Sequence, residues 1–374
     1  MPTGRIGLSI AMIFGLSACA GHVANPSAVP SRSASASVLP SVDASAVASV
    51  LPSESSADEP SGASGLALIR QVDNVGQVFL VDGAGEARQI TTFDPGTSFG
   101  GATSAAWSPD GTRMAVTLGV PVTVSVAIVE ADDGESRMID SAAFPAWAPD
   151  GSMLAVGIPF DAMGPGASET MPVSLIDPVS GNRHEIGFGL LPHWHPDGER
   201  IAVVRTVGET ETDPGESVIV LLSVSDGTEE IHLRGASSVG WSADGSRVVW
   251  EPVSTACSGI DCHRLLVGDV ATSAVIGEFI GAGQPHWSPD GERVAFTRQT
   301  HGAPEYAVAD LESGEIASFG DANGGSLSWA PDGKRLALSV SDANGSTTTE
   351  VVDVQSGRIL IELEGSGASW RPSP

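Results

Sequence analysis

A five-residue phrase recurs along this chain, and it constrains the fold more than any other feature. Each copy reads Trp, a Ser, Ala or His, then Pro or Ala, Asp and Gly. The full copies begin at Trp107, Trp147, Trp194, Trp241, Trp287 and Trp329, and a truncated copy begins at Trp370. Pro pre-sets a type I turn, Asp accepts backbone hydrogen bonds and Gly adopts the left-handed conformation that ends the turn. Because an apolar segment follows each full copy, the phrase predicts strand, tight turn, strand.

A second phrase interleaves with the first and ends an apolar run in a turn. Its turn positions are Asp82, Glu130, Asp177, Ser223, Asp269, Asp310 and Asp353. Together the two phrases give four short strands in each unit of about 44 residues, which is the spacing of a β-propeller blade. Since one blade cannot bury both of its faces, the units are expected to stack in a ring. Segments with a helical period are missing from the sequence.

The two ends of the repeat region complete each other. Strands expected near 66–70, 77–81 and 87–91 have no Trp phrase before them, and the segment 366–371 has no strands after it. The C-terminal strand is therefore expected to close the N-terminal blade. The predicted fold is an all-β, seven-bladed propeller spanning residues 66–374.

The Trp-Ser-Pro-Asp-Gly unit resembles the TolB-like propeller repeat of bacterial envelope proteins, over nearly all of residues 66–374. The resemblance implies a propeller fold and an envelope location. The chain departs from TolB in having seven predicted blades rather than six, and no counterpart of the N-terminal α/β domain of TolB.

The N-terminus has the layout of a secretory signal. Arg5 precedes an apolar run from Ile6 to Leu16, which is too short to span a bilayer, and small residues precede Cys19. The segment Leu-Ser-Ala-Cys resembles a bacterial lipobox, which implies a signal peptide over 1–18, cleavage before Cys19 and its diacylation. Two or three acyl chains would hold the protein on the extracytoplasmic side of the cell membrane or outer membrane. An ordinary signal peptide with an incidental cysteine is the alternative.

Residues 19–65 are dominated by Ser, Ala, Pro and Val. Such a segment has too little bulky apolar surface to offset the entropy of ordering it, so we expect a disordered linker between lipid and propeller. The remaining cysteines, Cys257 and Cys262, are expected to form a disulfide in an oxidising compartment. The alternative, a metal site, lacks a second Cys or His pair at suitable spacing.

The formal net charge of −28 argues against a nucleic-acid partner. It is consistent either with simple solubility or with an acidic face for cationic partners or Ca²⁺.

Loop lengths point to one sector of the predicted ring. The loops between the second and third strands are short in four blades and long at 157–171, 206–216 and 251–263, which belong to three consecutive blades. Binding residues concentrate on such loops, although tolerated loop growth is the alternative. The candidate binding face comprises Phe160, Asp161, Met163, Glu209, Glu211 and Asp213.

Signals for catalysis are few. Residues 96–100 match the letters of a nucleophile elbow, but that motif requires a strand-to-helix turn and this segment lies between two blades. No phosphate loop or dinucleotide fingerprint is found. The sequence therefore predicts neither an enzyme nor a cofactor.

Three histidines are weak candidates for a metal site. His193, His195 and His286 flank the repeat Trp, and two of them could converge near the central channel. Some propeller lyases acting on acidic sugars bind a divalent metal through a His-x-His pair, which His193 and His195 resemble in letters. The alternative is ordinary packed histidines.

The favoured hypothesis is a monomeric, lipid-anchored binding scaffold for an envelope protein, a peptide or a cell-wall glycan. The competing hypothesis is a metal-dependent polysaccharide lyase or hydrolase, in which His193, His286 and a carboxylate share a metal.

Overall fold

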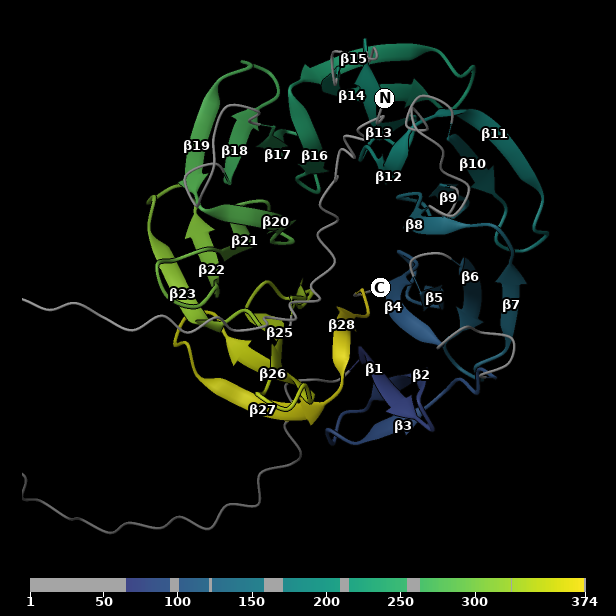
Figure 1. Ribbon diagram of the computed structural model, residues 1–374, viewed down its shortest axis with the longest axis vertical. Coiled ribbons are helices and arrows are strands. Elements are labelled where there is room, and N and C mark those ends of the chain that lie inside the picture. The colour runs from purple at the N-terminus through teal and green to yellow at the C-terminus, as the bar shows by residue number, and fades with distance from the viewer. Residues whose placement is uncertain are drawn as a thin grey trace, which may run out of the picture. The chain divides into compact units, whose positions relative to one another are not determined.

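Seven four-stranded antiparallel sheets form a ring in the computed structural model, which describes residues 65–94, 101–120, 123–157, 171–208, 215–253, 263–323 and 325–372 (Figure 1). All of them belong to one compact unit, Pro60–Pro374. Among these residues no helix is present, and therefore none that could cross a bilayer. The expected all-β, seven-bladed propeller is confirmed.

The strands are numbered along the chain, and the blades are numbered from the one that contains β1. Blade 1 contains β28 (Ser366–Trp370), β1 (Leu66–Val72), β2 (Val75–Val81) and β3 (Ala87–Gln89). Blade 2 contains β4 (Ala102–Trp107), β5 (Arg113–Val120), β6 (Thr123–Glu130) and β7 (Ser136–Ile139). Blade 3 contains β8 (Ala143–Trp147), β9 (Leu154–Gly157), β10 (Pro172–Ile176) and β11 (Arg183–Phe188). Blade 4 contains β12 (Leu190–Trp194), β13 (Arg200–Val207), β14 (Glu216–Ser223) and β15 (Glu229–Arg234).

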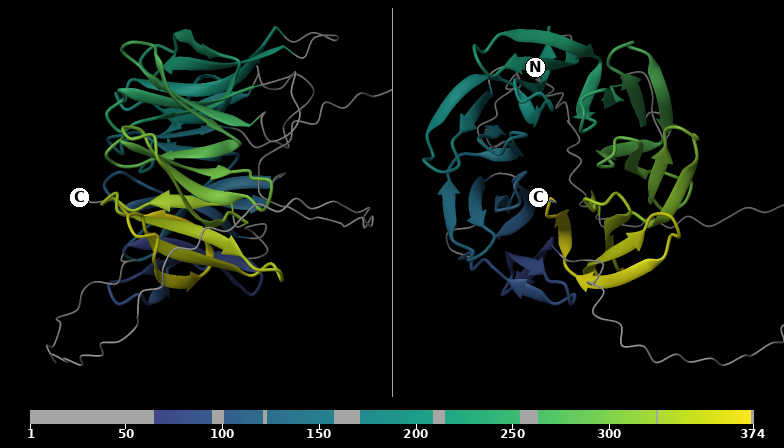
Figure 2. Two further views of the ribbon diagram at one scale, coloured as in Figure 1. Left: turned by 90° about the vertical axis from the view of Figure 1, so that its left-hand side faces the viewer. Right: turned by 180° about the vertical axis from the view of Figure 1, so that it is seen from behind.

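The remaining three blades follow the same order from the centre outwards. Blade 5 contains β16 (Ala236–Trp241), β17 (Arg247–Pro252), β18 (Arg264–Asp269) and β19 (Val275–Ile280). Blade 6 contains β20 (Ala282–Trp287), β21 (Arg293–Arg298), β22 (Glu305–Asp310) and β23 (Ile316–Asp321). Blade 7 contains β24 (Leu327–Trp329), β25 (Arg335–Ser341), β26 (Thr347–Asp353) and β27 (Ile359–Glu364). The first strand named in each blade lies nearest the ring axis (Figures 1 and 2).

The C-terminal strand closes the ring, as the sequence predicts. β28 pairs with β1 in antiparallel register, with Leu66 opposite Trp370, and the amide of Arg371 donates to the carbonyl of Gly65. Blade 1 therefore joins the two ends of the propeller chain in one sheet.

The Pro-Asp-Gly turns adopt the predicted chemistry. The Ser108 hydroxyl donates to Asp110 at 2.6 Å, the Thr112 amide donates to the same carboxylate at 3.0 Å, and Gly111 has a φ of 67°. The hydrogen bonds from Ser108 and from the Thr112 amide lower the pKa of Asp110 to about 2. These aspartates therefore hold turns together.

The repeat tryptophans connect neighbouring blades. Five of the indoles donate from Nε1 to the carbonyl that precedes the tryptophan of the previous blade: those of Trp107, Trp147, Trp194, Trp287 and Trp329. Four arginines that follow the phrase lie over the indole of the next blade, at 5.1–5.4 Å from the ring centroid: Arg113, Arg293, Arg335 and Arg371. The repeat tryptophans therefore fill the space between blades and bond one blade to the next.

The three long loops join the second and third strands of blades 3, 4 and 5. The loops themselves lie largely outside the described residues, but their flanking strands are described: β9 and β10, β13 and β14, β17 and β18. Each inner strand starts at the same face of the ring as these loops, because it runs antiparallel to the second strand of its blade. We call this side of the ring the loop face.

Candidate functional site

The position three residues before the repeat Trp distinguishes blades 3 and 4 from the others. This position, on the inner strand near the loop face, carries Phe144 in blade 3 and Leu191 in blade 4. In the other blades it carries Gly367, Ser104, Ser238, Gln284 and Ser326, in blade order. Two bulky apolar side chains therefore stand side by side in the ring where polar residues or glycine stand elsewhere.

Phe144 and Leu191 have strained backbone conformations. Their φ values are 54° and 51°. Each residue lies where the register of pairing between the inner strand and the second strand of its blade shifts. A residue with a β-carbon adopts this left-handed region at a cost of about 1–3 kcal/mol, and such outliers concentrate at functional sites. The corresponding residue of blade 1, Gly367, has a φ of 61° and no β-carbon. The chain thus keeps two large side chains where glycine fits with less strain.

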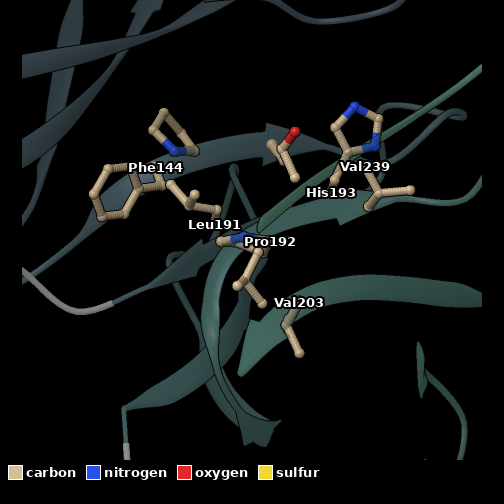
Figure 3. Close-up of a pocket in the computed structure, with 10 residues that line it drawn as sticks. Phe144, Leu191, Pro192, His193, Val203 and Val239 are labelled. Carbon is tan, nitrogen blue, oxygen red and sulfur yellow. The ribbon is translucent and has the colours of Figure 1, made fainter. Parts of the chain in front are cut away.

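These two residues line a pocket of about 260 Å³ that spans three blades (Figure 3). Its lining combines residues of β8, β12, β13 and β16: Phe144, Pro145, Ala146, Leu191, Pro192, His193, Val203, Val204, Ser238 and Val239. The ring of Phe144 lies at one end and His193 at the other. Blades 3, 4 and 5 are also the blades that carry the long loops.

The end of β9 connects the pocket to the first of these loops. A β-carbon at Gly157, the last residue of β9, would lie 3.7 Å from the Phe144 ring and 3.9 Å from Pro192. Gly157 thus borders the pocket wall at the point where the chain enters the loop 157–171.

Two polar residues, Ser238 and His193, belong to this otherwise apolar lining. The hydroxyl of Ser238 is buried and has no hydrogen-bond partner among the described residues. His193 Nδ1 lies 3.1 Å from the carbonyl oxygen of Trp194, and because a carbonyl only accepts, Nδ1 carries the proton. Nε2 of His193 therefore keeps the lone pair of a neutral imidazole.

His193 and His286 both lie on inner strands, at the position just before the repeat Trp, and both are exposed to solvent at the centre of the ring. Although both side chains are exposed, the strands crowded around them displace part of their hydration, and this desolvation lowers the pKa of each imidazole. The pKa of His286 falls to about 4, with repulsion from His193 adding to the shift. The two rings are close enough to interact electrostatically, and both are neutral at pH 7.

His195 is not grouped with them. β12 ends at Trp194, so His195 begins the turn and does not continue the alternation of the strand. Its Nδ1 lies 3.0 Å from the Asp197 carboxylate, and its ring meets Trp241 of blade 5 edge-on at a centroid distance of 4.6 Å. The two histidines of the His-x-His motif therefore have different surroundings: His193 lies on the inner strand and His195 lies in the turn that follows it.

The described residues do not supply a metal site. No three His, Cys, Asp or Glu side chains among them are grouped to hold an ion. Opposite Ser238, Glu251 on β17 accepts a hydrogen bond from the Gln284 amide at 2.8 Å, and burial raises its pKa. This carboxylate is thus engaged with the backbone of blade 6.

Several predicted residues lie outside the described part of the chain. These are Cys19, the expected disulfide pair Cys257 and Cys262, and the whole candidate binding face of Phe160, Asp161, Met163, Glu209, Glu211 and Asp213. Sequence reasoning missed Phe144, Leu191 and Ser238. Aligning the repeats on their tryptophans shows the unusual residues three positions earlier, and that signal was available.

The sequence matches no protein-family profile and no curated protein. Solved structures do match. TolB from Acinetobacter baumannii is 16% identical with a TM-score of 0.53, covering 82% of this chain and 82% of that chain. An oligogalacturonate lyase in complex with manganese is 14% identical with a TM-score of 0.58, covering 76% of this chain and 84% of that one.

An oligogalacturonate lyase from Vibrio parahaemolyticus is 13% identical with a TM-score of 0.59, covering 77% of this chain and 86% of that one. At such identities the likeness concerns the fold. The chain therefore has the fold of TolB-like β-propellers.

Proposed function

We propose that this protein is an exported, lipid-anchored binding scaffold, whose partner docks on the loop face over blades 3, 4 and 5. One observation carries the proposal: the pocket behind Phe144 and Leu191 lies in the same three blades as the three long loops. A largely apolar pocket with a few placed polar groups is typical of binding sites.

Site-specific photo-cross-linking in native membranes tests this proposal. The full-length chain would carry benzoylphenylalanine in place of Val253, which is 43% exposed, follows β17 at the loop face and does not line the pocket, or in place of Lys334, which is exposed in a turn on the opposite face. We expect a defined cross-linked partner from position 253 and none from position 334. The same adducts from both positions, or none from position 253, would contradict the proposal.

The anchor is a separate part of the proposal. It is supported by the apolar run from Ile6 to Leu16 and by Cys19 after small residues. Metabolic labelling with an alkyne fatty acid should label the wild-type chain and leave Cys19→Ser unlabelled. The variant should also leave the membrane fraction, because it has lost its acyl chains. Equal membrane retention of the two chains would remove the anchor from the proposal.

A metal-dependent lyase or hydrolase acting on polysaccharide is the second candidate. It is favoured by the presence of His193 and His286 together at the centre of the ring, and by the fold shared with two oligogalacturonate lyases. Metal analysis of the purified full-length chain, incubated with manganese and then dialysed, tests it. A stoichiometric ion that is lost in His193→Ala would support this candidate, and a metal-free wild-type chain would remove it.

A further inference from the structure

We infer that the pocket between blades 3, 4 and 5 takes one uncharged aromatic side chain that carries a hydrogen-bond donor, tyrosine or tryptophan, from a partner polypeptide. The inference rests on the proposed binding function and names the chemistry of its partner. Four observations support it: the size of the pocket, the composition of its walls, its two polar residues, and the apolar side chains of Phe144 and Leu191 at left-handed positions.

The size of the pocket fits part of a molecule. Its volume of about 260 Å³ lies below the range of about 300–1,000 Å³ that encloses a whole small ligand. Leu191 is 44% exposed, so its side of the pocket is open to solvent. A group inserted there would remain attached to a larger body outside, as a side chain is attached to its backbone.

The walls select against charge. None of the ten lining residues is Asp, Glu, Lys or Arg, although the chain carries a formal charge of −28. An ion inserted here would lose its hydration without gaining a counter-ion. An acidic sugar would find no cation, whereas the ring of Phe144 and the rings of Pro145 and Pro192 offer flat apolar contact to an aromatic group.

The lone pair on His193 Nε2 selects for a donor, whereas the Ser238 hydroxyl can pair with either a donor or an acceptor. The Ser238 hydroxyl is buried without a partner, and the neutral His193 ring keeps a lone pair on Nε2. A buried hydroxyl that lacks a partner destabilises the structure until a hydrogen bond is made. The phenol of tyrosine or the indole of tryptophan supplies a donor, and phenylalanine and leucine supply none. These two aromatic residues are also enriched at the energetic centres of protein interfaces.

The left-handed position of the inner strand carries apolar side chains only in blades 3 and 4. Gly367 occupies it in blade 1 with a φ of 61°, and Gln284 occupies it in blade 6 with a φ of 55°, so the strained conformation by itself does not mark a site. Phe144 and Leu191 differ from these residues because their side chains line the pocket. Gln284 has the same strain but does not line the pocket, and it therefore provides a matched control.

Saturation-transfer NMR with the full-length chain in detergent micelles tests the inference. The probes are N-acetyl-tyrosinamide, N-acetyl-tryptophanamide, N-acetyl-phenylalaninamide and p-cresol. We expect the tyrosine and tryptophan amides to bind about fivefold or more tightly than the phenylalanine amide, which is the range of one hydrogen bond. Leu191→Gly should weaken binding about tenfold, Gln284→Gly should leave it unchanged, and Ser238→Ala should reduce the preference for tyrosine over phenylalanine.

Three results would overturn the inference. Equal binding of the phenylalanine amide would remove the donor, and unchanged binding to Leu191→Gly would place the amides outside the pocket. Binding of p-cresol, which is the tyrosine side chain alone, is expected. A partner cross-linked from position 253 without binding of any amide would leave the proposed function intact and remove the aromatic anchor alone. Failure of both experiments would remove the proposed function as well.

Discussion

His195 occupies the turn position that serine holds in blades 2, 5 and 6, at Ser108, Ser242 and Ser288. Each of these serines donates to the aspartate two residues later, at 2.5–2.7 Å. His195 instead accepts a hydrogen bond at Nδ1 from the Asp197 amide at 3.2 Å, and it extends further than serine, so that its ring packs against Trp241 of the next blade. One substitution therefore adds a titratable group to an interface between blades.

Replacing this residue should alter the pH dependence of stability. Desolvation is the largest cause that lowers the pKa of His195, Arg200 lowers it further, and Asp197 acts in the opposite direction. Because the folded pKa lies below the unfolded value of about 6.5, the folded state favours the neutral ring. This contribution to stability is present above about pH 6.5 and is lost as the pH falls below that value.

We expect His195→Ser to lose less unfolding free energy than the wild type between about pH 7.5 and pH 5.5, as measured by chemical denaturation. His193 and His286 have pKa values lowered in the same direction and remain in both proteins, so they act as a common background. Repulsion from His195 contributes to the lowered pKa of His232, so its loss in the variant acts in the same direction as the loss of His195 itself. Identical pH profiles of the two proteins would contradict this account.

Residue identity alone did not predict which histidines belong together. His193 and His195 are two positions apart, a spacing that puts side chains on one face of a continuing strand. The strand ends between them at Trp194, so one ring lies at the centre of the ring of blades and the other packs in a turn. The end of a strand depends on pairing with its neighbour, and the letters of a motif do not show it.

At the scale of the strand, the sequence predicts the turn that follows each inner strand, but it does not predict the irregular pairing within the strand. The turn that follows each inner strand was predicted because Pro, Asp and Gly act through local chemistry. The irregular pairing at Phe144 and Leu191 was not predicted, because neither residue favours a positive φ and only the ring imposes it. An alignment of the repeats marks Phe144 and Leu191 as unusual, but only the structure shows that the two residues line one pocket.

A comparison of two tryptophans on inner strands can measure how much the indole hydrogen bond between blades contributes to stability. Trp194 and Trp241 are each 6% exposed, but Nε1 of Trp194 donates to the Ala146 carbonyl at 2.9 Å, whereas Nε1 of Trp241 has no partner among the described residues. Replacement by phenylalanine removes both indole donors and keeps an aromatic ring. The replacement at position 194 removes the donor from the Ala146 carbonyl, whereas the replacement at position 241 breaks no hydrogen bond among the described residues.

We therefore expect Trp194→Phe to lower the free energy of unfolding by about 1 kcal/mol more than Trp241→Phe does. Urea denaturation followed by circular dichroism would measure the difference. An equal loss in the two variants would show that the indole bond adds nothing beyond packing.

At the scale of the whole molecule, stability depends on joining the two ends of the propeller chain in blade 1. The buried cluster there combines Leu66 and Leu68 of β1 with Ala368 and Trp370 of β28, and it reaches Ala337 of blade 7. The sequence predicted this closure because each end held the part of a blade that the other end lacked.

Deletion of residues 366–374 should therefore abolish cooperative unfolding, since it removes Trp370 from the cluster and leaves the backbone of β1 unpaired on one edge. An exposed edge next to an apolar surface also promotes association between chains. A second variant would place residues 366–371 before Gly65 through a two-residue Asn-Gly turn, which fits because the amide of Arg371 donates to the Gly65 carbonyl, so that these two residues face each other across the antiparallel pair. This transplant restores every strand of blade 1 from one continuous segment, so we expect cooperative thermal unfolding and a monomeric elution volume to return. If the deletion variant unfolds at the midpoint of the wild type, packing between blades 1 and 7 closes the ring without β28.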